Sequence, residues 1–182
     1  DHIPEGTNGC GDSLTEDQRG VSRPSPTQGA CDIGAYEYLN REIDVFGNDV
    51  SILSGDSTPS DTDHTDFGIV AMGESLSRTF TIVSNGMTDL NLTGIAPDLV
   101  VISGENAGDF NVTTQPLTPL APGSSTTFMV EFAPSAGGIH EATLSIANDD
   151  GDENLYTFTI QGSGDPPEMN ILGNGVTISS GD

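Results

Sequence analysis

Apolar and polar residues alternate in several separate runs from residue 41 onward. Side chains of a strand point to opposite faces in turn, so a period of two gives each strand one apolar face. No window of eleven or more residues holds the i, i+3, i+4, i+7 spacing of an amphipathic helix. The chain is therefore predicted to be all-β, with one helical turn at most, at 104–109. The clearest runs lie at 78–83, 90–92, 110–112, 128–132, 142–146 and 156–160.

About seven or eight short strands, separated by turns rich in Gly, Pro and Asn, favour two antiparallel sheets packed face to face. A closed barrel would share the same local pattern and is the alternative. In either arrangement the apolar faces meet in one core. Its predicted members are Phe80, Ile82, Leu92, Phe128, Val130, Phe132, Leu144, Ile146, Phe158 and Ile160.

A repeat with an offset of 126 residues divides the chain. Residues 42–56 and 168–182 align without gaps, and eight of the fifteen positions are identical. Such a period indicates tandem modules. We therefore expect one complete module at 41–162, a Gly- and Pro-rich linker at 163–167, and the beginning of a second module at 168–182. Residues 1–38 are rich in Gly and turns and do not suffice for a core of their own.

The chain is strongly acidic. Its 182 residues hold 28 Asp and Glu against 4 basic residues, all Arg, for a formal net charge of −24. Such a surface repels phosphate backbones and anionic lipids, which excludes nucleic-acid binding and membrane-surface roles. No stretch approaches the ~20 apolar residues of a membrane span, and the first residues lack the basic start and apolar core of a signal peptide. We expect the sequence to be an internal piece of a larger protein.

Several sequence blocks resemble a known family. These are E-I-D-V-F-G-N at 42–48, H-T-D-F-G at 64–68, R-T-F-T-I at 78–82 and A-T-L-S-I-A-N-D-D at 142–150. Together, over about 41–164, they resemble the choice-of-anchor D family. The resemblance implies an immunoglobulin-like β-sandwich related to hydin-type repeats, found in tandem in large secreted or surface proteins of bacteria.

The N-terminal segment resembles a different family. D-Q-R-G at 17–20 and C-D-I-G-A-Y-E-Y at 31–38 are similar to the closing segment of choice-of-anchor Q proteins. The bodies of those proteins are right-handed parallel β-helices of the pectin-lyase type. The resemblance implies that residues 1–38 form the C-terminal cap of a β-helix, which would cover its exposed strand edges.

The two cysteines, Cys10 and Cys31, are predicted to form a disulfide. A zinc site would need about four nitrogen or sulfur ligands, and the three histidines lie far apart in the sequence. Two buried free thiols are the alternative. A disulfide would close a loop of about 20 residues, would be worth roughly 3 kcal/mol in the chain-entropy model, and would indicate an oxidising compartment outside the cytoplasm.

Two acidic loops are candidate calcium sites. The first has Asp149, Asp150, Asp152 and Asn154, together with Glu153, and the second has Asp56, Asp61 and Asp63, followed by Asp66. Crowded carboxylates repel one another, and a hard cation with oxygen ligands relieves this repulsion. Asp150, Asp152 and Asn154 match the first alternating ligands of an EF-hand, but the later glycine and glutamate are missing. The alternative for both loops is a solvated turn, because Asp and Asn favour turns.

No catalytic constellation survives inspection. Gly11–Leu14 spells G-D-S-L, as in some esterases, and D-x-x-H occurs at 61–64, but the two lie in different predicted domains and lack the required α/β context. A glycosidase pair of carboxylates would need aromatic sugar platforms, and the chain has no Trp. We expect His140 to be an edge or surface imidazole and not a ligand. We expect no enzyme activity from this chain.

Three functions remain as hypotheses. The first is a non-catalytic structural or adhesive module of a secreted or cell-surface protein. The second is an accessory region of a secreted β-helix enzyme that acts on polysaccharides. The third is a module that binds an extracellular glycan or a surface protein through its loops. Neighbouring modules of the same chain are expected partners in each case, and calcium is the one cofactor that the sequence suggests.

Overall fold

The computed structural model describes residues 2–4, 30–32, 41–168, 171–173 and 176–178. Strands β1 (His2–Pro4) and β2 (Ala30–Asp32) pair antiparallel. Most of the predicted cap at 1–38 lies outside the described residues, as does Cys10, and nothing is described of the Cys31 side chain. The Cys10–Cys31 disulfide and the β-helix cap therefore stay predictions.

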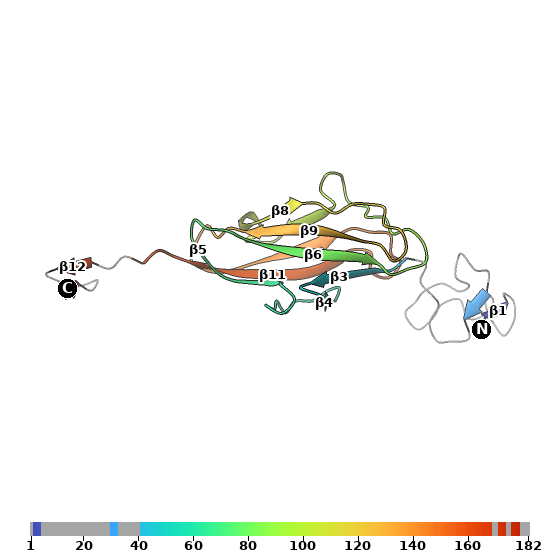
Figure 1. Ribbon diagram of the computed structural model, residues 1–182, viewed down its shortest axis with the longest axis horizontal. Coiled ribbons are helices and arrows are strands. Elements are labelled where there is room, and N and C mark those ends of the chain that lie inside the picture. Colours follow the sequence, from blue (N-terminus) through green and yellow to red (C-terminus); the bar gives the residue numbers. More distant parts are fainter. Residues whose placement is uncertain (1, 5–29, 33–40, 169–170, 174–175, 179–182) are drawn as a thin grey trace.

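Two sheets pack face to face between residues 43 and 165, so the predicted β-sandwich is confirmed (Figure 1). The five-stranded sheet has, in spatial order, β4 (Val50–Ile52), β3 (Ile43–Gly47), β6 (Leu76–Ser84), β9 (Ser125–Phe132) and β8 (Phe110–Thr114). The four-stranded sheet has β5 (Asp66–Ala71), β11 (Tyr156–Asp165), β10 (Gly138–Ile146) and β7 (Val100–Ser103). One pairing departs from the predicted antiparallel arrangement, because β5 runs parallel to β11.

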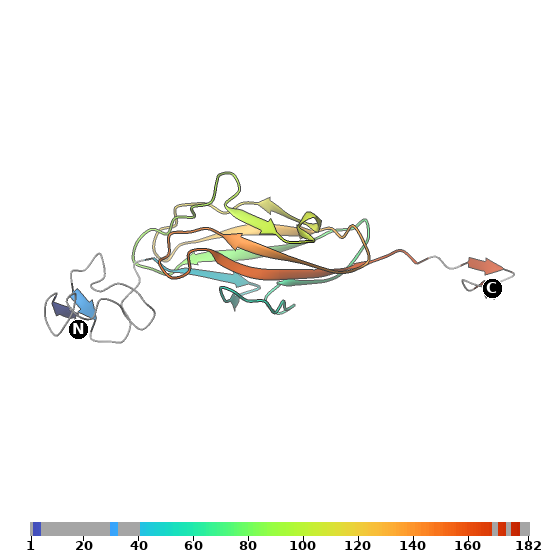
Figure 2. The same cartoon turned by 180° about the vertical axis from the view of Figure 1, so that it is seen from behind.

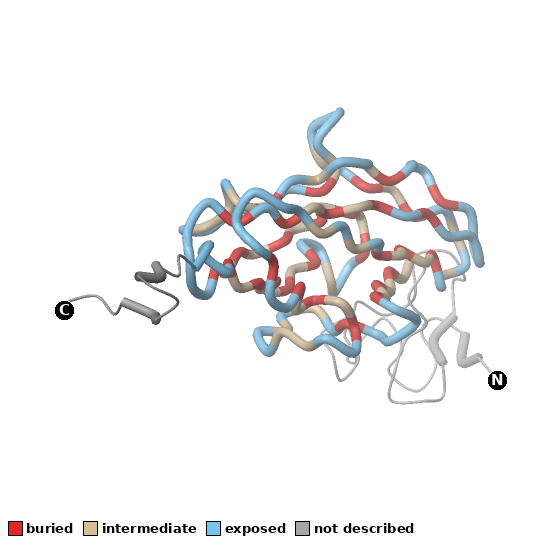
Figure 3. The backbone as a smooth tube through the Cα atoms, turned by 60° about the vertical axis from the view of Figure 1, so that its left-hand side comes forward, coloured by how far each residue is buried: buried red, intermediate tan, exposed pale blue. Residues whose placement is uncertain are grey.

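The core lies between the two sheets, and along each strand buried positions alternate with more exposed ones (Figure 3). All ten predicted core residues are buried. Phenylalanines form its centre: the rings of Phe80 and Phe128 stack at 5.3 Å, and those of Phe110 and Phe132 at 4.7 Å. Aromatic pairs at such distances add to the free energy gained by burial. Alternation therefore predicted the inward faces correctly.

Some local expectations were less accurate. Leu90 and Leu92 are buried as predicted, but they lie in single bridges to Leu120 and Asn148 and not in a strand. The predicted helical turn is a 3-10 turn, η1 (Ala107–Asp109). Strand β11 continues to Asp165, so Ser163–Asp165 of the predicted linker belong to the sandwich.

A glycine in β11 allows this strand to pack closely against an aromatic ring of the core. A Cβ on Gly162 would lie 2.4 Å from Cε1 of Phe132, closer than two carbon atoms can approach. Glycine at this position lets the backbone of β11 lie directly against the ring of Phe132, which is fully buried.

The chain enters the sandwich at one end and leaves it at the other (Figures 1 and 2). At the entry end, the start of β3 lies beside the β10–β11 connection, since the N–H of Ile43 donates to Asp150. At the exit end, Gly138 pairs with Gly164, and Met72 N–H donates to the carbonyl of Asp165. A following module would therefore continue the chain along the long axis of the sandwich.

The sequence repeat has a structural counterpart. Strands β3 and β4 form a hairpin in which Val45 pairs with Ile52 and Gly47 pairs with Val50. Strands β12 (Ile171–Gly173) and β13 (Val176–Ile178) form a second hairpin, in which the pairs are Ile171 with Ile178 and Gly173 with Val176. Each residue of the second hairpin is offset by 126 from its equivalent, so both copies have the same register.

Candidate functional site

A group of carboxylates gathers at the entry end of the sandwich. We call Glu42, Asp44, Asp150, Asp152 and Glu153 the acidic cluster. Glu42 and Asp44 lie at the beginning of the module, and the other three lie in the β10–β11 connection. The topology brings together two segments that are more than 100 residues apart. Among the described residues, one set of three acids has ligand atoms within 4.8 Å of one another: Glu42, Asp150 and Asp152.

Asp150 is the buried member of the acidic cluster, at 1% exposure. Its Oδ2 accepts the N–H of Ile43 at 2.9 Å, and its own N–H donates to Oδ1 of Asn148 at 2.8 Å. Asn148 is also buried, and its amide donates to the carbonyls of Ile146 and Glu153. The side chains of Asn148 and Asp150 thus fix the turn through hydrogen bonds to the backbone.

The electrostatics of the acidic cluster oppose ionisation. Burial raises the pKa of Asp150, and the nearby Asp152 adds to this effect. Burial raises the pKa of Glu153 to about 7, with further contributions from the charges of Asp150, Glu42, Asp152 and Asp44. Like charges near a carboxyl group disfavour its charged form. The acidic cluster can therefore exchange a proton near neutral pH, or hold a cation.

The structure changes the membership of the first predicted calcium loop. Asp150 and Asp152 come together as expected, and Glu42 joins them. Asp149 does not, because it forms an ion pair with Arg41 at 3.0 Å and accepts the amide of Asn91 at 2.7 Å. Asn154 is exposed. The signal for Glu42 was present in the sequence, since Glu42 begins the repeat, but sequence alone did not show that β3 starts beside this turn.

The second predicted loop is organised differently. Asp56 accepts the N–H and hydroxyl of Thr58, Asp63 accepts those of Thr65, and Asp66 accepts the N–H of Gly68. Each carboxylate therefore caps its own turn, two residues ahead, in the manner of an Asx turn. Asp61 is exposed, and no three of these acids bring their oxygens within 4.8 Å in the part of the chain that the structure describes.

His140 is buried, at 4% exposure, so the expectation of a surface imidazole was wrong. Its Nδ1 lies 2.8 Å from Oδ2 of Asp109, and its Nε2 lies 2.9 Å from the carbonyl oxygen of Ala136. Burial alone would raise the pKa of Asp109, but hydrogen bonds from Ser135 and His140 lower it overall. The pair ties η1 and the β9–β10 connection to β10. The alternation of β10 extends to His140, a signal that the sequence analysis did not use, and the sequence did not reveal its partner 31 residues earlier.

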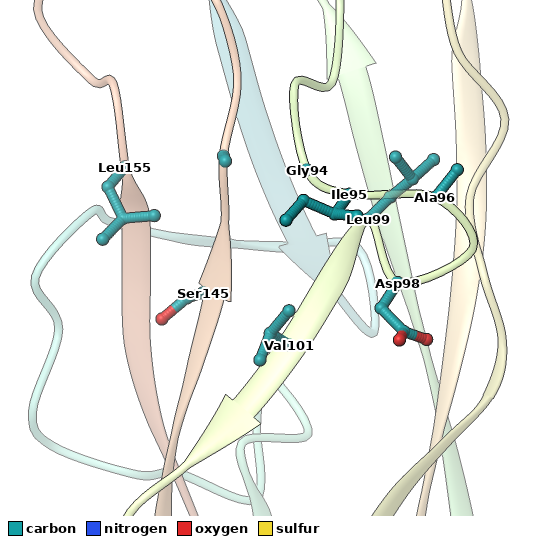
Figure 4. Close-up of a pocket in the computed structure, with 9 residues that line it drawn as sticks. Gly94, Ile95, Ala96, Asp98, Leu99, Val101, Ser145 and Leu155 are labelled. Carbon is teal, nitrogen blue, oxygen red and sulfur yellow. The ribbon is translucent and has the colours of Figure 1, made fainter.

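A shallow apolar hollow of about 450 Å³ lies over the outer face of β7 and β10, beside the loop before β7 (Figure 4). Ile95, Val101 and Leu155 line it and are exposed. Leu155 has a φ of 126°, a left-handed backbone conformation that is rare for a branched side chain. The sequence did not predict this hollow, since its residues come from three separate segments.

Comparison with known protein families identifies the family to which the sandwich is similar. A family model described as "HYDIN/CFA65/VesB-like, Ig-like domain" matches residues 60–163. A search of curated proteins found no match. Among the described residues, no helix is long and apolar enough to cross a membrane.

Solved structures with a similar arrangement include three from microorganisms. A Porphyromonas gingivalis W83 protein of unknown function is 17% identical (TM-score 0.46; 72% of this chain, 49% of that chain). The Vibrio cholerae VesB protease is 14% identical (TM-score 0.41; 69% and 32%). The CARDB domain of the Pyrococcus furiosus PF1109 protein is 10% identical (TM-score 0.38; 73% and 98%).

The chain spans about half of the length of the Porphyromonas gingivalis protein and about a third of the length of the VesB protease. Because the match to the family model covers more than half of the 182 residues, the immunoglobulin-like, hydin-type part of the sequence resemblance is confirmed, while the more specific assignments to choice-of-anchor D and Q stay predictions. The chain belongs to the HYDIN/CFA65/VesB-like family of Ig-like domains.

Proposed function

We propose that this chain is a non-catalytic structural module that acts as a spacer in a large secreted or cell-surface protein built from tandem copies. The observation that supports this proposal most strongly is the second hairpin. Its pairing repeats that of β3 and β4 residue for residue at an offset of 126. A chain that begins the same module again, shortly after finishing it, is built for repetition.

The direction of the chain supports the same proposal. Entry and exit lie at opposite ends of the sandwich (Figure 1), so successive modules add length. The junction is also stiff, because Pro166 and Pro167 follow β11, and proline restricts the backbone. A Cβ on Gly137 would lie 3.1 Å from Cδ of Pro166, so the first proline already packs against the exit end of the sandwich.

The charge suits an extended array outside the cell. The net charge of −24 over the 182-residue chain makes copies of the chain repel one another and keeps them soluble. In this proposal the acidic surface limits side-by-side packing, and neighbouring modules of the same chain are the first partners. Secretion rests on the sequence resemblance and on the predicted disulfide.

Single-molecule stretching of residues 41–165 tests the proposal. Tension applied at these ends runs along β11, which is held by β10 on one side and by β5 on the other, so the ladders must be sheared together. We expect one discrete unfolding event that releases about 400 Å of chain, from roughly 3.3–3.6 Å per residue. Gradual extension without such an event would contradict a role as a structural spacer.

A further inference from the structure

A hollow of about 370 Å³ lies at the turn that joins β3 to β4, against β6. Its size falls within the range of small-molecule sites. It is separate from the acidic cluster, which lies at the start of β3 and not at its end. Two of the residues that line the hollow, His64 and Arg78, carry buried polar atoms that have no hydrogen-bond partner.

Arg78 is the first of these residues. Its Nε is buried and unsatisfied, and no ion pair or hydrogen bond of its side chain occurs within the described part of the chain. Arg41, by contrast, is paired with Asp149. In a chain with 28 acidic residues and 4 arginines, an arginine without a carboxylate partner among the described residues is unexpected. A partly buried guanidinium is stabilised by an anion, and a carboxylate fits its planar set of donors.

His64 is the second. Its Nδ1 is buried without a partner, and its backbone has a φ of 66°, a conformation that is uncommon outside glycine. Burial lowers the pKa of His64, and the charge of Arg78 lowers it further. The ring is therefore neutral at neutral pH and offers one donor and one acceptor.

The remaining lining residues are polar and uncharged, apart from Asp49. Ser77, Thr79 and Thr81 of β6 also line the hollow, and they lie on the face of the strand opposite to Arg78. Asn48 lines it as well, with its amide N–H donating to the carbonyl of Thr62. Strand β3 ends at Gly47 opposite Phe80, so Leu76–Thr79 of β6 are paired only on the β9 side. The wall of the hollow thus combines one fixed positive charge with several groups that hydrogen-bond to hydroxyls.

We propose that this hollow binds a sugar unit that carries one carboxylate. Arg78 holds the carboxylate, His64 bonds to it or to a neighbouring hydroxyl, and Asp49 with the β6 hydroxyls holds the ring hydroxyls. Inorganic phosphate is disfavoured, because Asp49 and the net negative charge repel a dianion and Arg78 is the only cation in the lining. The proposal gives the module a binding site in addition to its role as a spacer.

Amide chemical shifts of the ¹⁵N-labelled 182-residue chain, titrated with glucuronate, test this. We expect saturable shifts at His64, Thr79 and Thr81. In Arg78→Gln the affinity should fall roughly tenfold to a hundredfold, which corresponds to one lost charge-assisted hydrogen bond. Arg41→Gln is the matched control and should bind as the wild type does, because Arg41 lies at the opposite end of β3 and is already paired.

Glucose, acetate and phosphate complete the titration. All three should bind more weakly than glucuronate. Equal binding of glucose would overturn the role of the carboxylate, equal binding of acetate would overturn the role of the ring, and tighter binding of phosphate would overturn the ligand class. An absence of saturable shifts in the wild type would overturn the site itself. If Arg78→Gln does not fold, Arg78→Lys keeps the charge but loses the planar pair of donors, and it should still weaken binding.

Discussion

The carboxylate of Asp150 accepts the backbone N–H of Ile43 at 2.9 Å, across 107 residues of sequence. This bond joins the first strand of the module to the last connection before β11. It also accounts for the buried carboxylate of the acidic cluster: Ile43 N–H needs an acceptor at a buried position, and Asp150 supplies one although Glu42, Asp152 and Glu153 are near.

Asp150→Ala should destabilise the module more than Asp150→Asn. The alanine leaves the N–H of Ile43 without an acceptor, which costs about 1–3 kcal/mol. The asparagine keeps an acceptor oxygen and removes one of the repelling charges. Urea unfolding at neutral pH measures both variants. An equal loss for the two would show that the hydrogen bond to Ile43 contributes nothing.

Glu153 gives the stability a defined dependence on pH. Its pKa is about 7 in the folded chain against a usual value of 4.5, so in this interval the folded state binds more protons than the unfolded state. The contribution of Glu153 to the free energy of unfolding is therefore largest below pH 4.5 and is lost as the pH rises through about 7. Glu153→Gln should be more stable than the wild type at neutral pH and should depend less on pH across this window. Melting temperatures of the wild type and of Glu153→Gln that change by the same amount between pH 5 and pH 7 would contradict this.

Calcium is predicted to bind at the acidic cluster. Binding between Glu42, Asp150 and Asp152 would neutralise the repulsion, so the melting temperature should be higher in millimolar calcium than in EDTA. Glu42→Gln should reduce this difference, while Asp61→Asn, in the exposed part of the second loop, should not. Identical melting temperatures in calcium and EDTA would remove calcium from the account.

The buried pair of His140 and Asp109 should be costly to break. Both neighbours of the imidazole, the Asp109 carboxylate and the Ala136 carbonyl, are acceptors. His140→Ala leaves Asp109 without this partner and should cost about 3–5 kcal/mol. The exposed neighbour Glu141 supplies the control Glu141→Gln. Since the pKa of Asp109 is lowered on folding, its contribution is present above its unfolded pKa and is lost as the pH falls through the folded value. A loss below about 1 kcal/mol in His140→Ala would show that the pair is not stabilising.

Gly162→Ala tests the contact with Phe132. The added methyl would lie 2.4 Å from Cε1 of the ring, and overpacking of this kind costs about 1–3 kcal/mol. Gly151→Ala is the matched control, because nothing lies within 4 Å of a Cβ there. Phe132→Leu should recover part of the loss when it is combined with Gly162→Ala. Equal stability of the two glycine variants would show that β11 can shift away from the ring.

The fold could be predicted from sequence to the extent that it depends on alternation. Phe80, Phe128 and Phe158 lie on inward faces because apolar residues that alternate along a strand all point to one side, and in a sandwich that side is the core. The parallel pairing of β5 with β11 could not be predicted, since it depends on where β5 joins the second sheet. The same limit applies to the sites: Asp150 lies beside Glu42 and accepts the N–H of Ile43, and His140 pairs with Asp109. These contacts form because the topology brings distant segments together, and no local sequence pattern indicates which segments will meet.

The most direct test of the central claim is small-angle X-ray scattering from a chain that joins two copies of residues 41–167. Entry and exit at opposite ends, with Pro166 and Pro167 between the modules, predict a maximum dimension close to twice that of residues 41–165 alone, unchanged by added salt. A maximum dimension near that of one module would mean that the two copies fold back side by side, and it would contradict the spacer account.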